Sequence, residues 1–228
     1  MVPQCACFAD IGCDHGKLCD LVLSTGRAKR AIATDLSNKS LLKARSKLGE
    51  CPNVNFRCGN GLSVLGPNEA DVICMAGMGA RTIQEILETG SNVARCAQYL
   101  ILSPHRHAER LRSFLGNASY AICAERIVRE RNHFYPVMLV QPADHSTIAD
   151  AFHEMVGWAD PRDPVVREYL NEMLRKSYWI LNKLEETQRD SARAASARMF
   201  VLRLETFLRA SGPYTEIGKV NAVTADIT

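Results

Sequence analysis

The sequence predicts an α/β fold, in which a mostly parallel sheet of seven strands is wound with helices and followed by an α-helical region. Between residues 5 and 140, short apolar runs rich in β-favouring residues alternate with longer helical patterns, as in parallel sheets. The last two runs are separated only by RERNH, which is too short for a crossover helix and predicts an antiparallel hairpin. Between Pro164 and Arg209 the chain has no glycine and no further proline, which favours long helices.

Strands and helices are predicted to alternate along residues 1–145. We expect strands over residues 5–12, 30–36, 54–60, 71–78, 99–104, 120–128 and 134–142. We expect helices over residues 16–24, 37–48, 79–88 and 105–116, each with a glycine, serine or proline near its start. This part of the chain is therefore predicted to form one Rossmann-like domain.

The following region, residues 146–210, is predicted to be a helical coiled-coil domain. Apolar residues recur there in steps of four and three along two series, which is the spacing of a coiled-coil seam. The first series is Val166, Leu170, Met173, Ile180 and Leu184, interrupted by Ser177, and the second is Ala194, Ala197, Val201, Leu204 and Leu208. Because the two series are out of phase, we expect two helices folded back on each other. Residues 211–228 hold few apolar side chains and are predicted to be a flexible tail.

Composition indicates an ordinary globular protein and excludes several classes. Hydrophobic residues make up 46% and charged residues 23% of the 228 residues, and there is no run of 18 apolar residues to span a membrane. The nine cysteines are odd in number and scattered, which favours free thiols in a reducing cytoplasm over a disulfide framework. Neither Cys5-x-Cys7 nor His105-x-His107 has further metal ligands nearby in the sequence, so we expect no metal site.

An acidic loop follows the first predicted strand. The stretch FADIGCDHG, residues 8–16, contains two glycines, two aspartates and a histidine within seven residues, namely Asp10, Gly12, Asp14, His15 and Gly16. A dinucleotide site would carry GxGxxG and bind a pyrophosphate at the helix N-terminus, and aspartates would repel that group. Carboxylates suit a cationic ligand, and S-adenosylmethionine carries both an ammonium and a sulfonium group. A tight turn with solvated aspartates is the alternative.

Polar side chains also end the second and third predicted strands. Asp35 stands 25 residues after Asp10, where a doubly wound fold places an acid at the ribose hydroxyls of a cofactor. Asn60 and Gly61 follow the third strand, where an amide can contact an adenine edge. The alternatives are a helix N-cap at Asp35 and a simple Asn-Gly turn. Three such strand ends in succession favour a cofactor site.

The fourth and fifth strand ends are predicted to face the substrate. Residues 77–79, Gly-Met-Gly, leave the fourth strand where methyltransferases hold the acceptor atom, and small residues allow a flat base to approach. Residues 103–105, Ser-Pro-His, end the fifth strand, so His105 could shape the substrate pocket. The alternatives are a glycine-rich turn before a helix and an ordinary helix-start residue.

Basic residues are concentrated in two segments, although the net charge is only +3. Residues 27–57 hold eight lysines and arginines, with Asp35 and Glu50 as their only acids. Arg106, Arg110 and Arg112 form a second cluster. Such surfaces can follow RNA phosphates. The alternative is that these are solvated helix faces.

The order of these motifs resembles the bacterial TrmK family. DIGCDHG, TDL, GNGL, AGMGAR and LSPH, followed by paired helices, carry the resemblance from about Val2 to about Leu208. Members are class I methyltransferases that methylate N1 of the adenine at position 22 of tRNA. The resemblance implies S-adenosyl-L-methionine as cofactor, tRNA as partner with no obligate protein partner, and a cytoplasmic enzyme.

The resemblance also implies roles for residues of this chain. Cofactor binding would fall to Asp10, Gly12, Asp14, His15, Gly16, Asp35, Leu36, Asn60, Gly61, Ala76 and Gly77. Substrate binding would fall to Gly79, Arg81, Pro104, Arg106 and Arg110, and catalysis to Asp14, Met78 and His105. Because adenine N1 carries a lone pair and the sulfonium is already activated, alignment of the reacting atoms supplies much of the acceleration.

The chain departs from the family pattern at three strand ends. Family members read GDGL where this chain has Asn60, GMGGR where it has Ala80, and Q-P-N at residues 103–105. Asn60 keeps an acceptor for the adenine amino group, whereas the third change bears on the choice of target base. The helical region that precedes the first strand in the family is nearly absent here, which can weaken tRNA docking. The alternative functions are methylation of another RNA base, a small molecule or a protein, and non-catalytic RNA binding.

Overall fold

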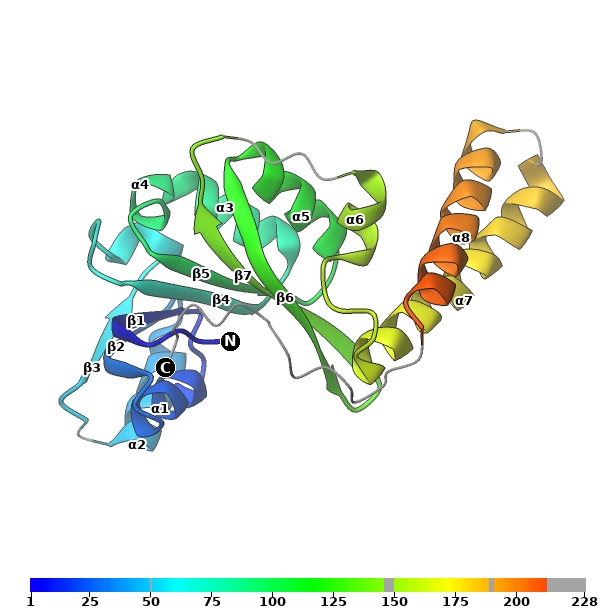
Figure 1. Cartoon of the computed structure of the whole chain (residues 1–228). Coiled ribbons are helices and arrows are strands. Elements are labelled where there is room, and N and C mark those ends of the chain that lie inside the picture. The colour runs from blue at the N-terminus through cyan, green and yellow to red at the C-terminus, as the bar shows by residue number, and fades with distance from the viewer. Residues whose placement is uncertain (50, 146–149, 189–190, 213–228) are drawn as a thin grey trace.

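Residues up to Pro142 form a seven-stranded sheet between two layers of helices, and a pair of long helices projects from one side of it (Figure 1). The computed structural model describes residues 1–49, 51–145, 150–188 and 191–212. The α/β class predicted from the sequence is confirmed. Within the described ranges, no helix is both long and apolar enough to cross a membrane.

The sheet has the strand order β3-β2-β1-β4-β5-β7-β6. Its strands are β1 (Cys5–Ile11), β2 (Ala28–Asp35), β3 (Val54–Cys58), β4 (Val72–Met78), β5 (Tyr99–Pro104), β6 (Tyr120–Glu130) and β7 (His133–Pro142). The first five strands are parallel, and β7 lies antiparallel between β5 and β6. The seven predicted strands and the antiparallel hairpin at the end of the sheet are confirmed.

Helices cover both faces of the sheet because successive strand residues point to opposite sides. The helices α1 (Lys17–Ser24) and α2 (Asn38–Leu48) lie on one face, and α3 (Ala80–Thr89), α4 (Ser91–Ala94) and α5 (Ala108–Asn117) lie on the other (Figure 1). In β1, Phe8 packs against the α1 side, whereas Ala9 and Ile11 pack with the core formed by α3 and α5. A short 3₁₀ helix, η1 (Gly61–Val64), follows β3.

Helix α5 begins three residues later than predicted. The sequence predicts that this helix starts at residue 105. In the structure, residues 105–107 form a turn that ends in His107, whose φ of 60° is left-handed. The helix therefore begins at Ala108. This turn leaves the side chains of His105 and Arg106 exposed beyond the end of β5.

The C-terminal region contains α6 (Ala151–Val156), α7 (Pro164–Gln188) and α8 (Ala192–Ala210). Helices α7 and α8 are antiparallel neighbours, as predicted from the break in the apolar pattern (Figure 1). The Tyr178 hydroxyl donates to Glu205 at 2.5 Å, and Arg198 pairs with Glu185 at 2.8 Å. Buried side chains of α6, α7, α8 and β6 form one apolar cluster that fastens the helical pair to the sheet.

The seam between α7 and α8 differs from the prediction at one position. The heptad spacing places Ile180 in the seam, but its side chain is 47% exposed, and Leu181 is buried at 6% exposure. The prediction is wrong there because an α-helix has 3.6 residues per turn, so a strict seven-residue repeat drifts around the helix by about 20° per heptad. After Ser177 the buried position therefore moves by one residue.

Two predicted boundaries adjoin residues outside the described ranges. The sheet domain is predicted to end at residue 145, next to residues 146–149, and the tail is predicted to begin at residue 211. Both stay predictions, because only residues 211 and 212 of the tail lie within the described ranges.

Candidate active site

The carboxyl ends of β1, β2 and β3 meet at one edge of the sheet and are joined by backbone hydrogen bonds. Gly12 N and Cys13 N both donate to the Thr34 carbonyl, at 2.9 and 2.8 Å. Gly59 N donates to the Asp35 carbonyl at 3.0 Å. These bonds bring together the three loops that are predicted to hold a cofactor.

The Asp35 carboxylate organises this edge. Its Oδ1 accepts from Ser37 N at 2.8 Å, and its Oδ2 accepts from Asp14 N at 3.2 Å. The N-cap of α2 is Ser37, whose side chain accepts from Ser40 N at 3.3 Å, so the alternative of Asp35 as the N-cap is wrong. Because an ionised carboxylate offers about four lone-pair sites, Asp35 can hold the β1 loop and still accept from ligand hydroxyls.

Leu36 and Asn60, which are predicted to contact the adenine of the cofactor, stand beside Asp35. The Leu36 side chain is 72% exposed, although large apolar side chains usually lie inside a protein. Asn60 is exposed at the start of η1 and makes no capping hydrogen bond there. An exposed apolar side chain next to a carboxylate and an amide is a surface that a nucleoside would cover.

The glycines of these loops serve different purposes. Gly12 has a φ of +77°, and a Cβ added to it would stand 3.1 Å from Cε of Met78, so Gly12 lets the β4 end approach the β1 loop. A Cβ on Gly16 would lie 2.8 Å from a side-chain carbon of α2, and one on Gly61 would lie 3.0 Å from Ile86. Gly16 and Gly61 are therefore required for helix packing, whatever ligand the site holds.

Three carboxylates give this edge its charge. Asp10 is only 5% exposed, and burial is the main cause that raises its pKa to about 7. The charge of Asp35 raises this pKa further, and a weak hydrogen bond from the Cys19 thiol lowers it. Asp14 is exposed, with His15 Nε2 3.3 Å from its Oδ2. A cationic ligand would relieve the repulsion among these acids, whereas a pyrophosphate would increase it.

Two of the residues predicted to act in catalysis, Met78 and His105, lie at the ends of β4 and β5, whereas the third, Asp14, lies in the loop after β1. The strand pairing is irregular between Ala76 and Met78, and Gly77 between them has a φ of +78°. His105 N donates to the Met78 carbonyl at 2.9 Å. The His105 Nε2 lies 3.7 Å from where a Cβ on Gly77 would stand. Because the Met78 side chain also reaches Gly12, the ends of β4 and β5 lie next to the acidic ends of β1 and β2.

The predicted substrate-binding residues lie around the ends of β4 and β5, and they differ in how far they are exposed to solvent. Gly79 precedes α3 and is exposed, and Arg81 in the first turn of α3 is 92% exposed and paired with Glu85 at 2.8 Å. Arg106 and Arg110 are exposed, whereas Pro104 is buried and can only shape the wall of the site. Their roles stay predictions. Within the described ranges, no cluster of three or more His, Cys, Asp or Glu side chains could hold a metal ion.

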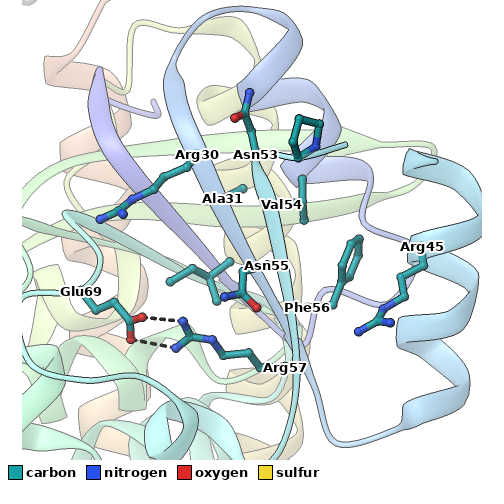
Figure 2. Close-up of a pocket in the computed structure, with 11 residues that line it drawn as sticks. Arg30, Ala31, Arg45, Asn53, Val54, Asn55, Phe56, Arg57 and Glu69 are labelled. Atoms are coloured by element: carbon teal, nitrogen blue, oxygen red, sulfur yellow. Dashed lines mark hydrogen bonds and ion pairs between the residues drawn. The ribbon is translucent and has the colours of Figure 1, made fainter. Parts of the chain in front are cut away.

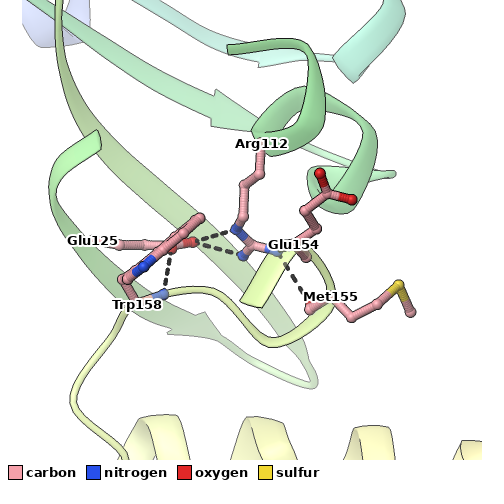
Figure 3. A network of polar contacts seen from close by, with 5 residues as sticks. All are labelled: Arg112, Glu125, Glu154, Met155 and Trp158. Carbon is pink, nitrogen blue, oxygen red and sulfur yellow. Dashed lines mark hydrogen bonds and ion pairs between the residues drawn. The ribbon is translucent and has the colours of Figure 1, made fainter. Parts of the chain in front are cut away.

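Arg112 does not belong to the exposed basic cluster in which the sequence placed it. Its side chain and that of Glu125 are both fully buried, with Arg112 donating to Glu125 Oε1 at 2.6 Å (Figure 3). Arg112 also donates to the carbonyls of Glu154 and Met155, at 2.8 and 3.2 Å. Since α5 has a period of 3.6 residues, Arg112 lies on its buried face and Arg110 on its exposed face.

The Arg112–Glu125 pair connects the sheet domain to the start of the helical pair. Trp158 N donates to Glu125 Oε2 at 2.9 Å, so α5, β6 and the segment after α6 share one network (Figure 3). Gly157 has a φ of +84°, and a Cβ there would lie 2.6 Å from Glu125 Oε2. Such crowding leaves no room for a side chain at Gly157.

Tyr135 and His133 lie beside His105, although no sequence motif indicated either residue. The Tyr135 and His105 rings have centroids 5.6 Å apart and planes at 85°, and the His133 ring lies 6.5 Å from Tyr135. The predicted β6–β7 hairpin could have indicated both residues. Because β7 runs antiparallel to β5, its first residues lie where β5 ends.

A pocket lies along the edge strand β3, away from the strand ends (Figure 2). Its cavity is about 600 Å³ and is lined by Arg30, Arg45, Asn55, Phe56, Arg57 and Glu69, among others. Arg45 lies over the Phe56 ring at 5.2 Å, and Arg57 is held by Glu69 at 2.5 Å. The Arg57 hydrogen bonds are the main cause that lowers the pKa of Glu69 to about 2. This β3-edge pocket gathers three arginines of the basic segment 27–57.

The fold and the strand-end loops together define a Rossmann-like methyltransferase. A family model described as a methyltransferase domain matches residues 1–138. The tRNA (adenine(22)-N(1))-methyltransferase of Bacillus subtilis (strain 168) is 33% identical over 159 residues, which are 68% of this chain and 67% of that protein. The chain therefore belongs to the tRNA (adenine(22)-N(1))-methyltransferase family.

Solved structures share the fold over nearly the whole chain. The Bacillus subtilis M1A22 tRNA methyltransferase TrmK has a TM-score of 0.72 at 27% identity, covering 92% of both chains. A Streptococcus agalactiae protein of the NADB-Rossmann superfamily has a TM-score of 0.78 at 27% identity, covering 91% of this chain and 92% of that one. Streptococcus pneumoniae Sp1610, solved with S-adenosyl-L-methionine, has a TM-score of 0.78 at 24% identity, covering 91% and 94%.

Proposed function

We propose that this protein transfers the methyl group of S-adenosyl-L-methionine to N1 of an adenine in tRNA, at position 22. One observation carries the proposal. The acidic strand ends of β1 and β2 lie directly beside the glycine-containing strand ends of β4 and β5, because the Met78 side chain reaches Gly12. Membership of the tRNA (adenine(22)-N(1))-methyltransferase family supports the choice of substrate. A tRNA substrate implies that the protein acts in the cytoplasm.

The acidic edge would hold the cofactor. Asp35 would accept from the ribose hydroxyls, and Leu36 and Asn60 would contact the adenine. The β1 loop, with Asp14 and His15, would face the methionine end, and the buried Asp10 would act on it through charge. When bound, S-adenosyl-L-methionine supplies a methyl group activated by a positively charged sulfur.

The β4–β5 edge would hold the base. Adenine N1 needs no strong base, because it attacks through an in-plane lone pair, so the main task of the protein is alignment. Attack leaves a cationic ring, which the carbonyls of residues 77–79 or the side chains of Asp14 and His105 would stabilise. An adenine in folded tRNA presents its N1 only when unpaired, so we expect the base to be flipped into the site.

The exposed arginines would hold the tRNA backbone. Arg106 and Arg110 lie next to the base site, and Arg30 and Arg45 line the β3-edge pocket. The helical pair α7 and α8 would extend this surface. Phosphate contacts of this kind add affinity that falls with salt.

Transfer of a labelled methyl group to unmodified tRNA tests the proposal. We expect label on N1 of a single adenine, identified by nuclease mapping of the modified nucleotide. Label on another base, on a small molecule or on a protein would select the corresponding alternative function. Poor cofactor binding in calorimetry, together with no transfer of label to any acceptor, would favour a non-catalytic RNA-binding relative.

A further inference from the structure

We infer that Tyr135 and His105 form the subsite that receives the target base, with Tyr135 as the stacking surface. This inference rests on the proposed function and assigns a binding role to Tyr135, in a strand where the sequence motifs indicated no site. The ligand it takes is a flat nucleobase that has left its own stack.

The sheet topology brings Tyr135 to the active-site edge. Strand β7 pairs antiparallel with β5, with Leu102 opposite Met138 and Leu100 opposite Val140. Continuing this register, the first residues of β7 lie beyond the carboxyl end of β5. They therefore reach the edge at which β4 and β5 present Met78 and His105.

The packing of β7 determines which way Tyr135 faces. Phe134 packs against Tyr169 of α7, with ring centroids 5.8 Å apart, and belongs to the cluster that fastens the helical pair. Because successive strand residues point to opposite faces, Tyr135 points away from α7 and toward His105. The anchor at Phe134 thus holds Tyr135 in register.

The two rings form a corner of the right shape for a base. Their centroids are 5.6 Å apart and their planes meet at 85°, so a base stacked on Tyr135 would present an edge to His105. His105 is exposed and Tyr135 is half-buried, so the corner is open to a ligand. Since His105 Nε2 lies close to Gly77, a base in this corner stands beside the predicted acceptor position.

The charges near the corner suit a nucleic acid. Arg106 follows His105 directly, and Arg131 and His133 lie in and next to the β6–β7 turn; all three are exposed. Phosphates that flank a flipped nucleotide would meet the two arginines, while the base itself stacks.

Single-turnover methyl transfer to tRNA tests the stacking role, with saturating cofactor and tRNA. Base–aromatic stacking contributes about 1–3 kcal/mol, so we expect Tyr135→Ala to slow transfer by roughly 10- to 100-fold. Tyr135→Phe keeps the ring and should stay within about threefold of the wild-type rate. Tyr99→Ala, at the opposite end of β5, is the matched control for loss of a half-buried tyrosine, and cofactor affinity should be unchanged in all three variants.

Three results would overturn the inference. The first is equal rates for Tyr135→Ala and Tyr99→Ala, and the second is a Tyr135→Phe rate as low as that of Tyr135→Ala. The third is loss of cofactor affinity in Tyr135→Ala, since the residue would then support the cofactor site.

A second measurement separates this inference from the proposed function. tRNA carrying 2-aminopurine at position 22 should fluoresce more strongly with Tyr135→Ala than with Tyr135→Phe, because a flipped base that stacks on a ring is quenched. This difference does not require methyl transfer. If it is seen and no methyl is transferred, the subsite stands and the proposed function fails. If methyl transfer proceeds and the two variants give equal fluorescence, the subsite fails.

Discussion

The two halves of the carboxyl edge of the sheet differ in charge and in the kind of surface that they present. The half made by β1, β2 and β3 carries Asp10, Asp14 and Asp35 and the exposed Leu36. The half made by β4, β5 and β7 carries aromatic rings and exposed arginines. The acids would suit a cationic cofactor, and the arginines would suit a polyanion.

The two halves also differ in the structural elements that form them. The acidic half is made of loops that directly follow their strands and are joined by backbone hydrogen bonds. The aromatic half depends on an antiparallel strand and on packing against α7. The acidic half can therefore be identified from short motifs, and the aromatic half only from the assembled fold.

Arg112→Ala should lower the free energy of unfolding by about 3–5 kcal/mol, because it leaves Glu125 charged and unpaired in the interior. Chemical denaturation measures the change. Arg110→Ala on the exposed face of the same helix is the control, and it should leave stability unchanged while weakening tRNA binding and reducing the salt slope by about one. If Arg112→Ala kept full stability and lost tRNA binding, Arg112 would belong to the RNA surface after all.

Asp35→Ala should weaken binding of S-adenosyl-L-methionine by about 100-fold, since hydrogen bonds to a charged group contribute about 1.5–3 kcal/mol each. The variant also loses the contact with Asp14 N, so the β1 loop is less well held. Isothermal titration calorimetry measures the affinity. Asp20→Ala, an exposed acid within α1, is the matched control and should bind as the wild type does. Equal affinities for the two variants would contradict the assignment of the acidic half.

The free energy of unfolding of the ligand-free protein should fall as the pH rises, because of Asp10. Its pKa is about 7 in the folded protein, whereas an ordinary solvated aspartate has a pKa of 3.8, so the folded state holds one more proton between these values. Stability should fall through this window, by about 2 kcal/mol between pH 5 and 7, since one pKa unit corresponds to about 1.4 kcal/mol.

Asp10→Asn should remove this fall in stability, and Asp20→Asn should keep it. Burial holds the pKa of Cys19 and Cys74 well above the usual thiol range, so these neighbours of Asp10 stay neutral throughout the window. Denaturant unfolding at several pH values measures the effect. An unchanged pH profile in Asp10→Asn would assign the slope to another group.

Leu36→Ala should weaken cofactor binding by about tenfold and leave stability unchanged. The expected loss corresponds to about 1.5 kcal/mol for a leucine side chain that a ligand covers. Leu42→Ala on α2 is the matched control, because Leu42 is 64% exposed and Leu36 is 72% exposed in the ligand-free protein. A tenfold loss in both variants, or in neither, would mean that Leu36 does not contact the adenine.

Much of the fold and of the acidic half could be predicted because their signals are local. Alternating apolar runs and short connections indicated the parallel strands, and the five residues RERNH were too few for anything other than a hairpin. The acidic loop and Asp35 stand directly after strands, where parallel topology leaves them at one edge. Local chemistry therefore indicated both the architecture and the class of ligand.

The strands along the chain, the separate helical pair, and the acids and glycines that end the first three strands can all be recognised from the sequence alone. Three features emerge only in the folded protein: Arg112 is buried against Glu125, Leu181 replaces Ile180 in the seam, and Tyr135 lies against His105. A sequence motif depends on residues that are neighbours in the chain. Burial, ion pairing and ring contacts depend on partners distant in sequence, and only the packed fold brings them together.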